Sequence, residues 1–559
     1  MILQKRLPAL AAPLIALLLA GCPANNPATT DAPPVLPRKT VDAASTGAFQ
    51  NTDPYLLSTT DPEAHRGNHG IYLSNGTIGA TFGATGSATE KSVTFRAGVY
   101  DAKETLAPVF TGYALPIAAP KAGETYKQTL DIKRGVLVTE HGGRTITAFV
   151  SAAKPDIVVL NIKGGTRTDA TPIGERFGKP ETVSGKTEAT TRYVCGDAAT
   201  GTEPNKEPGA SESFTTVYAV SEGKSEAAAK EAAYNAAQSA LASGFDALLA
   251  AHEAVWAARW KTAGIEIEGD PEAQQLVNKL TFDLLQSVAV GGDHSVAPEA
   301  LSGDFYKGHI FWDADIWMFP SLLPQYPEAA RNLLDYRYKH LPEARKIAAN
   351  AGFAGADYPW ESAATGQEVA PSGFSTERHV TGGVGFAATQ YYLATGDAGW
   401  LRERGYPVIS GVADHFASRA KKGGDGAYHI NKVFGPDENR GTVNDNTYTN
   451  ALAKYCLESA GDAAKAVNQP ANAQWGVVAK NIALPFDKKR GAYQARASDD
   501  DRPTKQADGE LVIYPARLSM DKATAEKTFD YHSPRPIKTG PAMTASMHAL
   551  IAARLGRAA

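Results

Sequence analysis

The sequence changes character at Ser225, and this change constrains the fold more than any other feature of the chain. Before it, from about Thr52, short apolar segments alternate with turn-forming Gly and Pro residues. After it, residues 226–260 are dominated by alanine, the residue with the highest helix propensity. A chain of 559 residues is long enough for two or three domains. We therefore predict a β-domain over 51–225 and a helical linker over 226–270, before a third, helical unit.

The β-domain is predicted from turn and strand patterns. Asn75-Gly76 lies between two apolar segments, which is a strong short-range signal for a β-hairpin. Residues 145–150 alternate between apolar and polar side chains, and residues 157–160 form a short apolar run. These segments favour a sandwich of two sheets.

The linker carries aromatic residues at helical spacing. His252, Trp256 and Trp260 stand at i, i+4 and i+8, so they share one helix face, which we interpret as a packing surface. Beyond Pro271, Pro or Asp often begins and Gly often ends a periodic segment. The predicted helices are 271–290, 309–323, 327–351, 379–395, 399–420, 446–460, 463–481 and 541–557. Their pairing across loops suggests an α/α barrel.

The N-terminus looks like a targeting segment. Lys5 and Arg6 precede an apolar run over 7–20, which is too short to span a membrane. The run ends in Leu-Ala-Gly-Cys22, which resembles a bacterial lipobox; the alternative is a plain secretory signal in which Cys22 is incidental. We expect residues 1–21 to be a signal peptide, Cys22 to carry lipid that anchors the exported protein to a bacterial membrane, and the Pro-rich residues 22–50 to be a flexible tether.

Charge and the remaining cysteines exclude several classes of protein. The net charge of −4 gives no basic footprint for nucleic acid. Cys195 and Cys456 lie far apart and match neither a disulfide framework nor a zinc motif, so we predict two buried thiols. No cofactor or metal is expected.

The first motif with chemical content is Gly308-His-Ile-Phe-Trp-Asp-Ala-Asp-Ile-Trp317. Carboxylates beside tryptophans suit a sugar, because the acids accept hydroxyl protons while the rings cover apolar C–H faces. Helical spacing would place Asp313 and Trp317 on one face, and approximately Trp312 and Asp315 on another. The alternative is an interfacial helix with solvated acids. A metal site built on His309 and Asp313 lacks further converging ligands.

Two loops carry further acids. Trp360-Glu361 follows Pro359, at a turn or a helix start, where the pair either packs or binds. Asp437 and Glu438 follow Gly435-Pro436, so their backbone is held. Taken alone, this pair is more typical of a turn or a helix cap. A general acid would need a raised pKa, which the apolar Val433 and Phe434 could supply.

Together, the segments FWDADIW, PWES, GPDE, KQAD and GPAMT resemble glycoside hydrolase family 65, in identity and in order. The resemblance runs from about Asp53 to Ala559, and it is strongest to the hydrolytic branch of kojibiose hydrolases, acid trehalases and protein-glucosylgalactosylhydroxylysine glucosidases. It implies an N-terminal β-supersandwich, a helical linker and an (α/α)6 barrel. Its implied activity is that of an inverting α-glucosidase, acting on an α-glucoside whose linkage the sequence leaves open.

The resemblance also implies roles for individual residues. Glu438 corresponds to the general acid, and Asp437 to a supporting carboxylate. The implied substrate-binding residues are Trp312, Asp313, Trp360, Glu361, Lys505 and Gln506.

Some features of the family are not matched. The general base belongs to a segment beyond GPAMT, and no residue of the sequence corresponds to it, so we expect the barrel over 271–559 to lack its last helices and the C-terminal β-domain. Thr381, Gly383, Asn439 and Ala545 also depart from the family pattern. We expect weak hydrolysis at best. The alternatives are a lipid-anchored carbohydrate-binding protein without turnover and an inverting disaccharide phosphorylase.

Overall fold

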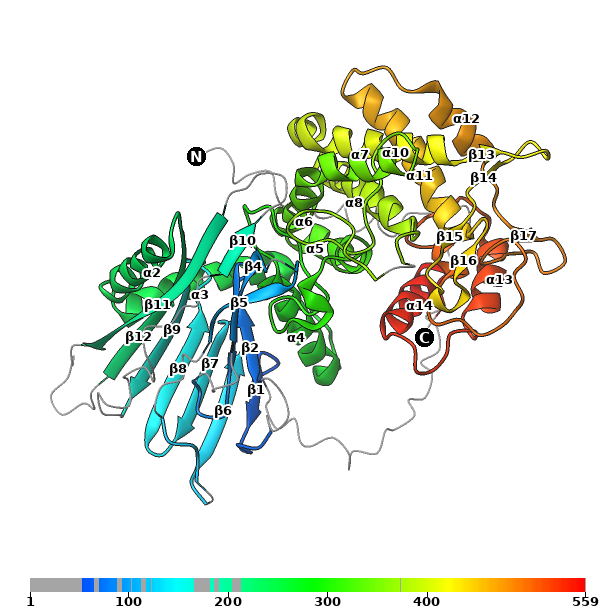
Figure 1. Cartoon of the computed structure of the whole chain (residues 1–559). Helices are drawn as coiled ribbons and strands as arrows, with labels where there is room; N and C mark the ends of the chain where they lie inside the picture. The colour runs from blue at the N-terminus through cyan, green and yellow to red at the C-terminus, as the bar shows by residue number, and fades with distance from the viewer. Residues whose placement is uncertain are drawn as a thin grey trace.

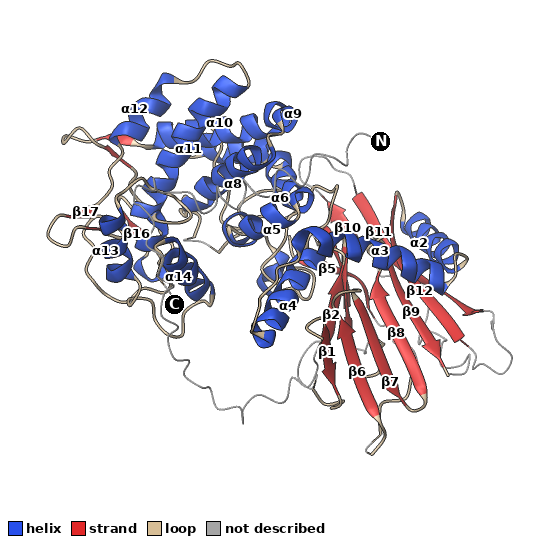
Figure 2. Cartoon of the chain, turned by 180° about the vertical axis from the view of Figure 1, so that it is seen from behind, coloured by secondary structure: helices blue, strands red, loops and turns tan. Residues whose placement is uncertain are grey.

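The computed structural model describes residues 53–557, apart from 65–69, 88–92, 102, 112–116, 122, 165–180, 185–190, 204–212 and 372–373. An antiparallel β-domain is followed by a helical region, and the two halves lie side by side (Figure 1). Figure 2 shows that long strands are confined to one half and most helices to the other. This order of β-domain and helical region confirms the coarse organisation predicted from the change at Ser225.

The β-domain consists of two antiparallel sheets. The larger sheet has the order β1 (Leu56–Thr59), β6 (Tyr126–Asp131), β7 (Val136–His141), β8 (Arg144–Val150), β9 (Ile157–Lys163), β12 (Ser213–Gly223), β11 (Thr191–Glu203) and β10 (Glu181–Ser184). The smaller sheet has the order β2 (Ile71–Ser74), β3 (Ile78–Phe82), β4 (Val93–Tyr100) and β5 (Leu106–Thr111). Strands β2 and β3 pair across Asn75-Gly76, as the hairpin signal predicted.

Strand β9 shows why its sequence is a continuous apolar run. Val158 and Leu160 face the core between the sheets, whereas Ile157 and Val159 face the opposite side. That second side is covered by helices α2 (Glu226–Leu241) and α3 (Phe245–Ala263), which follow the larger sheet in the chain. A strand buried on both faces has no polar face, so the run does not alternate.

The aromatic stripe of α3 packs, as predicted. Trp256 is 1% exposed and stacks on Phe282 with ring centroids 4.8 Å apart. Trp260 Nε1 donates a hydrogen bond to the Ile132 carbonyl at 3.1 Å, and His252 Nε2 lies 3.1 Å from the Gly135 carbonyl. These contacts dock the linker onto the β-domain and onto helix α4 (Pro271–Ser287).

The helical region follows α4. It contains a π-helical turn (Asp313–Met318), α5 (Phe319–Gln325), α6 (Pro327–Lys339), α7 (Leu341–Asn350), α8 (His379–Thr395), α9 (Ala398–Trp400), α10 (Tyr406–Arg419), α11 (Thr447–Ala466), α12 (Ala473–Asn481), α13 (Lys522–His532) and α14 (Met543–Arg554). Three short ribbons join these helices: β13 (Lys421–Lys422) with β14 (Tyr428–His429), β15 (Val433–Phe434) with β16 (Thr442–Val443), and β17 (Phe486–Asp487) with β18 (Ala492–Tyr493).

Several predicted helix boundaries are wrong. The helix expected from 309 begins only at Asp313, because the backbone of Ile310 pairs with that of Ser362 in an antiparallel bridge instead of entering a helix. The helix expected over 327–351 is interrupted at His340, just before Pro342, which has no N–H to continue the ladder. The helix expected over 463–481 is divided, since α11 continues to Ala466 and α12 starts only at Ala473. The sequence patterns did not predict α13.

Helix α8 lies at the centre of this region and packs on α5, α6, α10 and α11. Its glycines allow that proximity. A Cβ on Gly382 would lie 2.8 Å from Leu452 Cβ of α11, and one on Gly385 would lie 2.8 Å from Cys456 Sγ. The two thiols, Cys195 and Cys456, are free and buried, as predicted.

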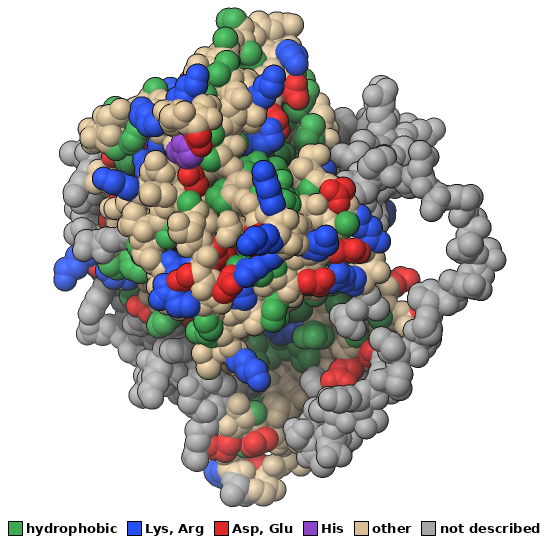
Figure 3. All heavy atoms as spheres, turned by 90° about the vertical axis from the view of Figure 1, so that its right-hand side faces the viewer, with side chains coloured by type: hydrophobic (Ala, Val, Ile, Leu, Met, Phe, Trp, Pro, Cys, Tyr) green, Lys and Arg blue, Asp and Glu red, His purple; other side chains and the backbone are tan. Residues whose placement is uncertain are grey.

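The predicted signal peptide, Cys22 and the tether over 22–50 lie outside the described residues. Within the described ranges, no helix combines the length and the apolar character needed to cross a bilayer. On the face drawn in Figure 3, acidic and basic side chains are interspersed and form no patch of a single sign.

Candidate active site

Trp312 stands at the start of the π-helical turn and is the centre of a cluster of aromatic rings. It is 2% exposed. Its ring centroid lies 4.6 Å from that of His379, 5.3 Å from Trp317, and 6.3 Å from both Trp360 and Tyr448. The FWDADIW and PWES motifs therefore meet at this cluster, although 48 positions separate the two tryptophans.

The two acids of FWDADIW have different environments. Burial, together with the negative charges of Asp315 and Glu438, raises the pKa of Asp313 to about 6. Asp315 is instead a core residue, since it and Arg337 are each 1% exposed and Arg337 Nη2 donates to Asp315 Oδ2 at 2.5 Å. Of these two acids, only Asp313 lies within electrostatic reach of Glu438 as a candidate for substrate binding.

The PWES loop is held from within. Glu368 accepts hydrogen bonds from the backbone N–H groups of Trp360 at 2.8 Å and of Glu361 at 3.1 Å. The Glu361 carboxylate lies 2.7 Å from His309 Nδ1, and His309 Nε2 lies 2.7 Å from the Glu104 carbonyl. His309 is therefore occupied by protein oxygens, which leaves no basis for the His309–Asp313 metal site. Within the described ranges, no group of three His, Cys, Asp or Glu residues is placed to hold a metal ion.

The GPDE segment is presented by the short ribbon of β15 and β16. Gly435 is required there, because a Cβ at this position would lie 2.4 Å from Asn446 Nδ2. Asn446 in turn donates to Asp508 of KQAD at 2.9 Å. Asp437 is 1% exposed and accepts a hydrogen bond from Arg440 Nε at 2.9 Å, so its carboxylate serves the local structure.

The KQAD segment lies directly against GPDE. The backbone N–H of Lys505 donates to Asp437 Oδ1 at 2.8 Å, and Gln506 Nε2 donates to the Pro436 carbonyl at 2.7 Å. The Lys505 ammonium lies 2.7 Å from Glu438 Oε2, and the Glu438 side chain is 19% exposed. Of the two adjacent acids, Glu438 is the accessible one and Asp437 the buried one.

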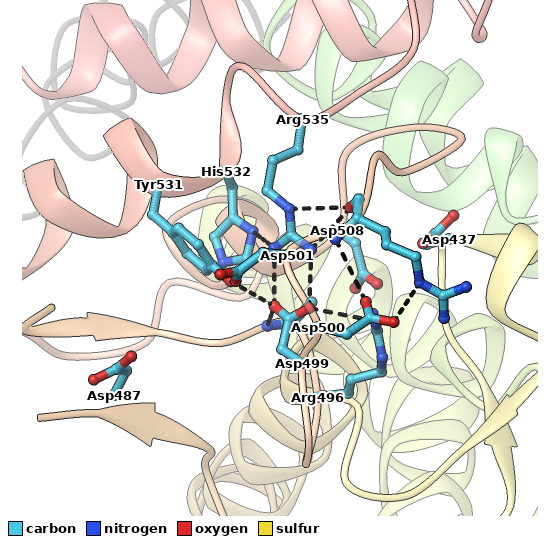
Figure 4. Close-up of polar contacts among 12 residues, drawn as sticks. Asp437, Asp487, Arg496, Asp499, Asp500, Asp501, Asp508, Tyr531, His532 and Arg535 are labelled. Carbon is cyan, nitrogen blue, oxygen red and sulfur yellow. Dashed lines mark hydrogen bonds and ion pairs between the residues drawn. The ribbon is translucent and has the colours of Figure 1, made fainter. Parts of the chain in front are cut away.

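A network of buried ions supports the KQAD segment from behind (Figure 4). Asp499 accepts hydrogen bonds from both Nη atoms of Arg535, at 2.8 and 2.9 Å, and lies 3.3 Å from Arg496 Nη2. The backbone of Arg535 continues this support, since its carbonyl accepts from the Thr504 N–H at 3.1 Å. Thr504 immediately precedes Lys505, so the network fixes the position from which the ammonium reaches Glu438.

The structure adds Glu377, which the motifs did not reveal. It is 1% exposed, and neither carboxylate oxygen has a hydrogen-bond partner among the described residues. Burial, followed by the charge of Glu438, raises its pKa to about 9, so the carboxyl is neutral at pH 7. Its Oε2 lies 3.4 Å from His379 Nε2, beside the ring cluster. In the sequence, Glu377 stands just before an apolar helix and resembles an ordinary charged residue at a helix start, so no motif indicated a role for it.

The structure brings most of the predicted site residues together around Glu438 and the ring cluster: Trp312, Asp313, Trp360, Glu438, Lys505 and Gln506. Glu361 is instead turned toward His309. Aromatic faces, a neutral buried carboxyl and an accessible carboxylate paired with an ammonium form a site suited to acid catalysis on a polyhydroxylated ring.

The chain is similar to several curated proteins. A kojibiose hydrolase from Mucilaginibacter mallensis is 41% identical over 317 residues, which are 56% of this chain and 47% of the relative. A protein-glucosylgalactosylhydroxylysine glucosidase from Gallus gallus is 35% identical over 346 residues, covering 59% and 49% of the two chains. The chain spans about half the length of these curated relatives.

The fold has a solved counterpart. A putative kojibiose phosphorylase from human microbiome superposes with a TM-score of 0.74 at 18% identity, over 90% of this chain and 83% of that one. Residues 280–498 match the glycosyl hydrolase family 65 central catalytic domain, and they include FWDADIW, PWES and GPDE. Residues 280–498 of this chain therefore form a glycosyl hydrolase family 65 central catalytic domain.

Proposed function

We propose that this protein is an inverting α-glucosidase that hydrolyses a glucosyl disaccharide or a glucosyl-galactose unit, with Glu438 as the proton donor. The observation that carries the proposal is the position of Glu438, which is accessible, paired with Lys505 at 2.7 Å, and close enough to Asp313 and Glu377 to raise the pKa of both. The kojibiose hydrolases among the relatives support this reaction class.

In the proposed reaction, the Glu438 carboxyl donates its proton to the glycosidic oxygen as the bond from that oxygen to the glucose C1 breaks. Water attacks C1 from the opposite face, which inverts the configuration. We assign no described residue as the base that takes the proton of this water, so we expect hydrolysis by this chain to be weak. The two carboxyl groups of an inverting glycosidase lie roughly 6.5–9.5 Å apart, which leaves space for that water. Trp312 and Trp360 would cover the apolar faces of the glucose ring, and Asp313 would accept hydroxyl protons.

Lys505 lies beside the proton donor in this proposal. Its ammonium is 2.7 Å from Glu438 Oε2. Sugar hydroxyls that bind the ammonium would therefore lie next to the carboxyl that protonates the leaving oxygen. Gln506 Oε1 is buried without a hydrogen-bond partner among the described residues, so it is available as an acceptor for a sugar hydroxyl.

We also propose that the enzyme is exported and anchored by lipid on Cys22. The support is the order of Lys5-Arg6, the apolar run over 7–20 and Leu-Ala-Gly-Cys22 in the sequence. Labelling of cells with a radioactive fatty acid, followed by isolation of the protein, tests this anchor. The wild-type chain should carry label and a Cys22→Ser variant should not. Equal labelling of both would contradict the anchor.

Substitution of Glu438 tests the proton donor. Glu438→Gln should abolish release of glucose from kojibiose while the affinity for glucose stays within a few-fold of wild type. The matched control is Glu458→Gln, because Glu458 also pairs with a lysine (Lys454, 2.7 Å) but is 57% exposed and lies on the outside of α11. Glucose release by Glu438→Gln at the wild-type rate would contradict the assignment.

The same assay separates the two alternatives. Kojibiose phosphorylases stand among the relatives, for example one from Thermoanaerobacter brockii that is 36% identical over 279 residues. Production of glucose 1-phosphate that depends on added phosphate would identify a phosphorylase. Glucose binding without turnover in the wild-type chain would identify a carbohydrate-binding protein.

A further inference from the structure

The turn before the FWDADIW motif exposes two adjacent aromatic side chains. Phe305 is 62% exposed and Tyr306 is 55% exposed, and their rings meet edge to face with centroids 4.6 Å apart. Single exposed apolar residues are common on protein surfaces, so exposure alone indicates nothing. We call this pair the Phe305–Tyr306 ledge.

The backbone beneath the ledge is held in a conformation that L-residues disfavour. Tyr306 has φ 55° and Lys307 has φ 56°, both in the left-handed region, and Gly308 follows with φ 65°. The β-domain fixes this turn, because Tyr100 Oη donates to the Gly308 carbonyl at 2.9 Å and a Cβ on Gly308 would lie 2.5 Å from Leu106 Cβ. Strain of this kind persists only where the surrounding structure determines it, and it is concentrated at functional positions.

A row of aromatic rings connects the ledge to the candidate active site. Tyr306 lies 5.5 Å from Phe311, measured between ring centroids, and Phe311 lies 5.7 Å from Trp360. Trp360 in turn lies 6.3 Å from Trp312, at the centre of the ring cluster. The ledge is therefore the exposed end of a row of edge-to-face ring contacts that runs through the buried Phe311 to Trp360, at the proposed glucose-binding position.

Charged groups flank the exposed rings. Asp304 and Lys307, the residues on either side of the pair, are both exposed. Apolar faces beside a carboxylate and an ammonium suit a sugar ring, which presents C–H groups to aromatic faces and hydroxyls to charges. A purely apolar partner would leave the charges without a role.

We propose that the Phe305–Tyr306 ledge binds the second sugar of the substrate, the hexose that leaves when the glucosidic bond breaks. This inference rests on the proposed function, because it takes the terminal glucose to lie at Trp312 and Trp360. The leaving hexose packs its C–H face on the exposed rings, and its hydroxyls bond to Asp304 and Lys307. Specificity for the leaving group is then set at this turn, outside the glucose-binding position.

Calorimetric titration of glucose and of kojibiose tests the ledge. All variants carry Glu438→Gln, so that kojibiose is not hydrolysed during the titration. Phe305→Ala and Tyr306→Ala should each raise the Kd for kojibiose roughly five- to tenfold, because an apolar contact is lost, and change the Kd for glucose less than about twofold. Tyr306→Phe keeps the ring and should bind kojibiose as the parent does.

Phe486→Ala is the matched control. Phe486 is also an exposed phenylalanine, 39% exposed, that meets a tyrosine edge to face, with the Tyr493 centroid 5.0 Å away. It should leave both affinities unchanged.

Three results would overturn the ledge: an unchanged kojibiose Kd in Phe305→Ala and Tyr306→Ala while glucose still binds, an equal loss in Phe486→Ala, or a loss in Tyr306→Phe as large as in Tyr306→Ala. If neither the wild-type chain nor the parent binds glucose, the proposed function fails, and the ledge with it.

Discussion

Replacement of Asp499 by asparagine tests whether the buried ions of Figure 4 hold the KQAD segment in place. The Asp499 side chain is 0% exposed and that of Arg535 is 7% exposed. Burial by itself would raise the pKa of Asp499, but the hydrogen bonds and the charge of Arg535 outweigh it and hold that pKa well below its ordinary range. Asparagine would remove the charge and leave the Arg535 guanidinium buried beside a neutral amide.

The expected loss is large, because removal of one partner of a buried ion pair costs about 3–5 kcal/mol of unfolding free energy. Its pH dependence follows from the depressed pKa of Asp499. The stability that the ionised carboxylate provides is fully present above its unfolded pKa of about 3.9, and it is lost as the pH falls toward the lower folded value. The difference between wild type and Asp499→Asn should therefore be constant from pH 6 to 8 and shrink below about pH 4.

Urea unfolding followed by tryptophan fluorescence measures this difference. Asp530→Asn is the control, because Asp530 pairs with Arg557 at the surface, where it is 60% exposed, and its loss should cost less than about 1 kcal/mol. The double variant Asp499→Leu/Arg535→Leu removes both charges and should lose less stability than the sum of the two single changes. An Asp499→Asn variant within about 1 kcal/mol of wild type at pH 7 would refute the reasoning.

Three further predictions concern buried groups elsewhere. The folded pKa of Glu377, about 9, lies above its unfolded value, so the stability that its proton provides is full below about pH 4.5 and is lost as the pH rises toward 9. Glu377→Gln should remove this part of the pH dependence of the unfolding free energy. Unfolding free energies that change in parallel for both proteins from pH 6 to 9, measured with urea, would contradict it. Trp256→Ala should cost about 3–5 kcal/mol, since the ring is 1% exposed and stacks on Phe282, and a urea-unfolding loss under about 1 kcal/mol would contradict that packing. Cys195 and Cys456 should react with Ellman's reagent only after unfolding, because burial excludes the reagent and raises the pKa of both thiols; rapid reaction in native buffer would show that at least one thiol is accessible.

Local patterns in the sequence determined the organisation of the chain. The change at Ser225, the Asn75-Gly76 hairpin and the bounds of α8 all depend on residues within a few positions of one another, and the structure agrees with each. Helix ends were less predictable. The interruption at His340 and the late start at Asp313 depend on contacts with other segments, which periodicity does not contain. The catalytic and binding roles that the family resemblance assigns stay predictions.

The candidate active site depends on contacts between segments that are distant in the sequence. Composition and spacing treat Asp313 and Asp315 alike, yet the fold places one near Glu438 and the other on Arg337 in the core. The contact between Glu438 and Lys505 joins residues that are 67 positions apart. The sequence by itself therefore determined which motifs are present and in what order. Only the tertiary structure decided which carboxyl is buried, neutral, paired or accessible, because desolvation and charge pairing depend on neighbours brought together by packing.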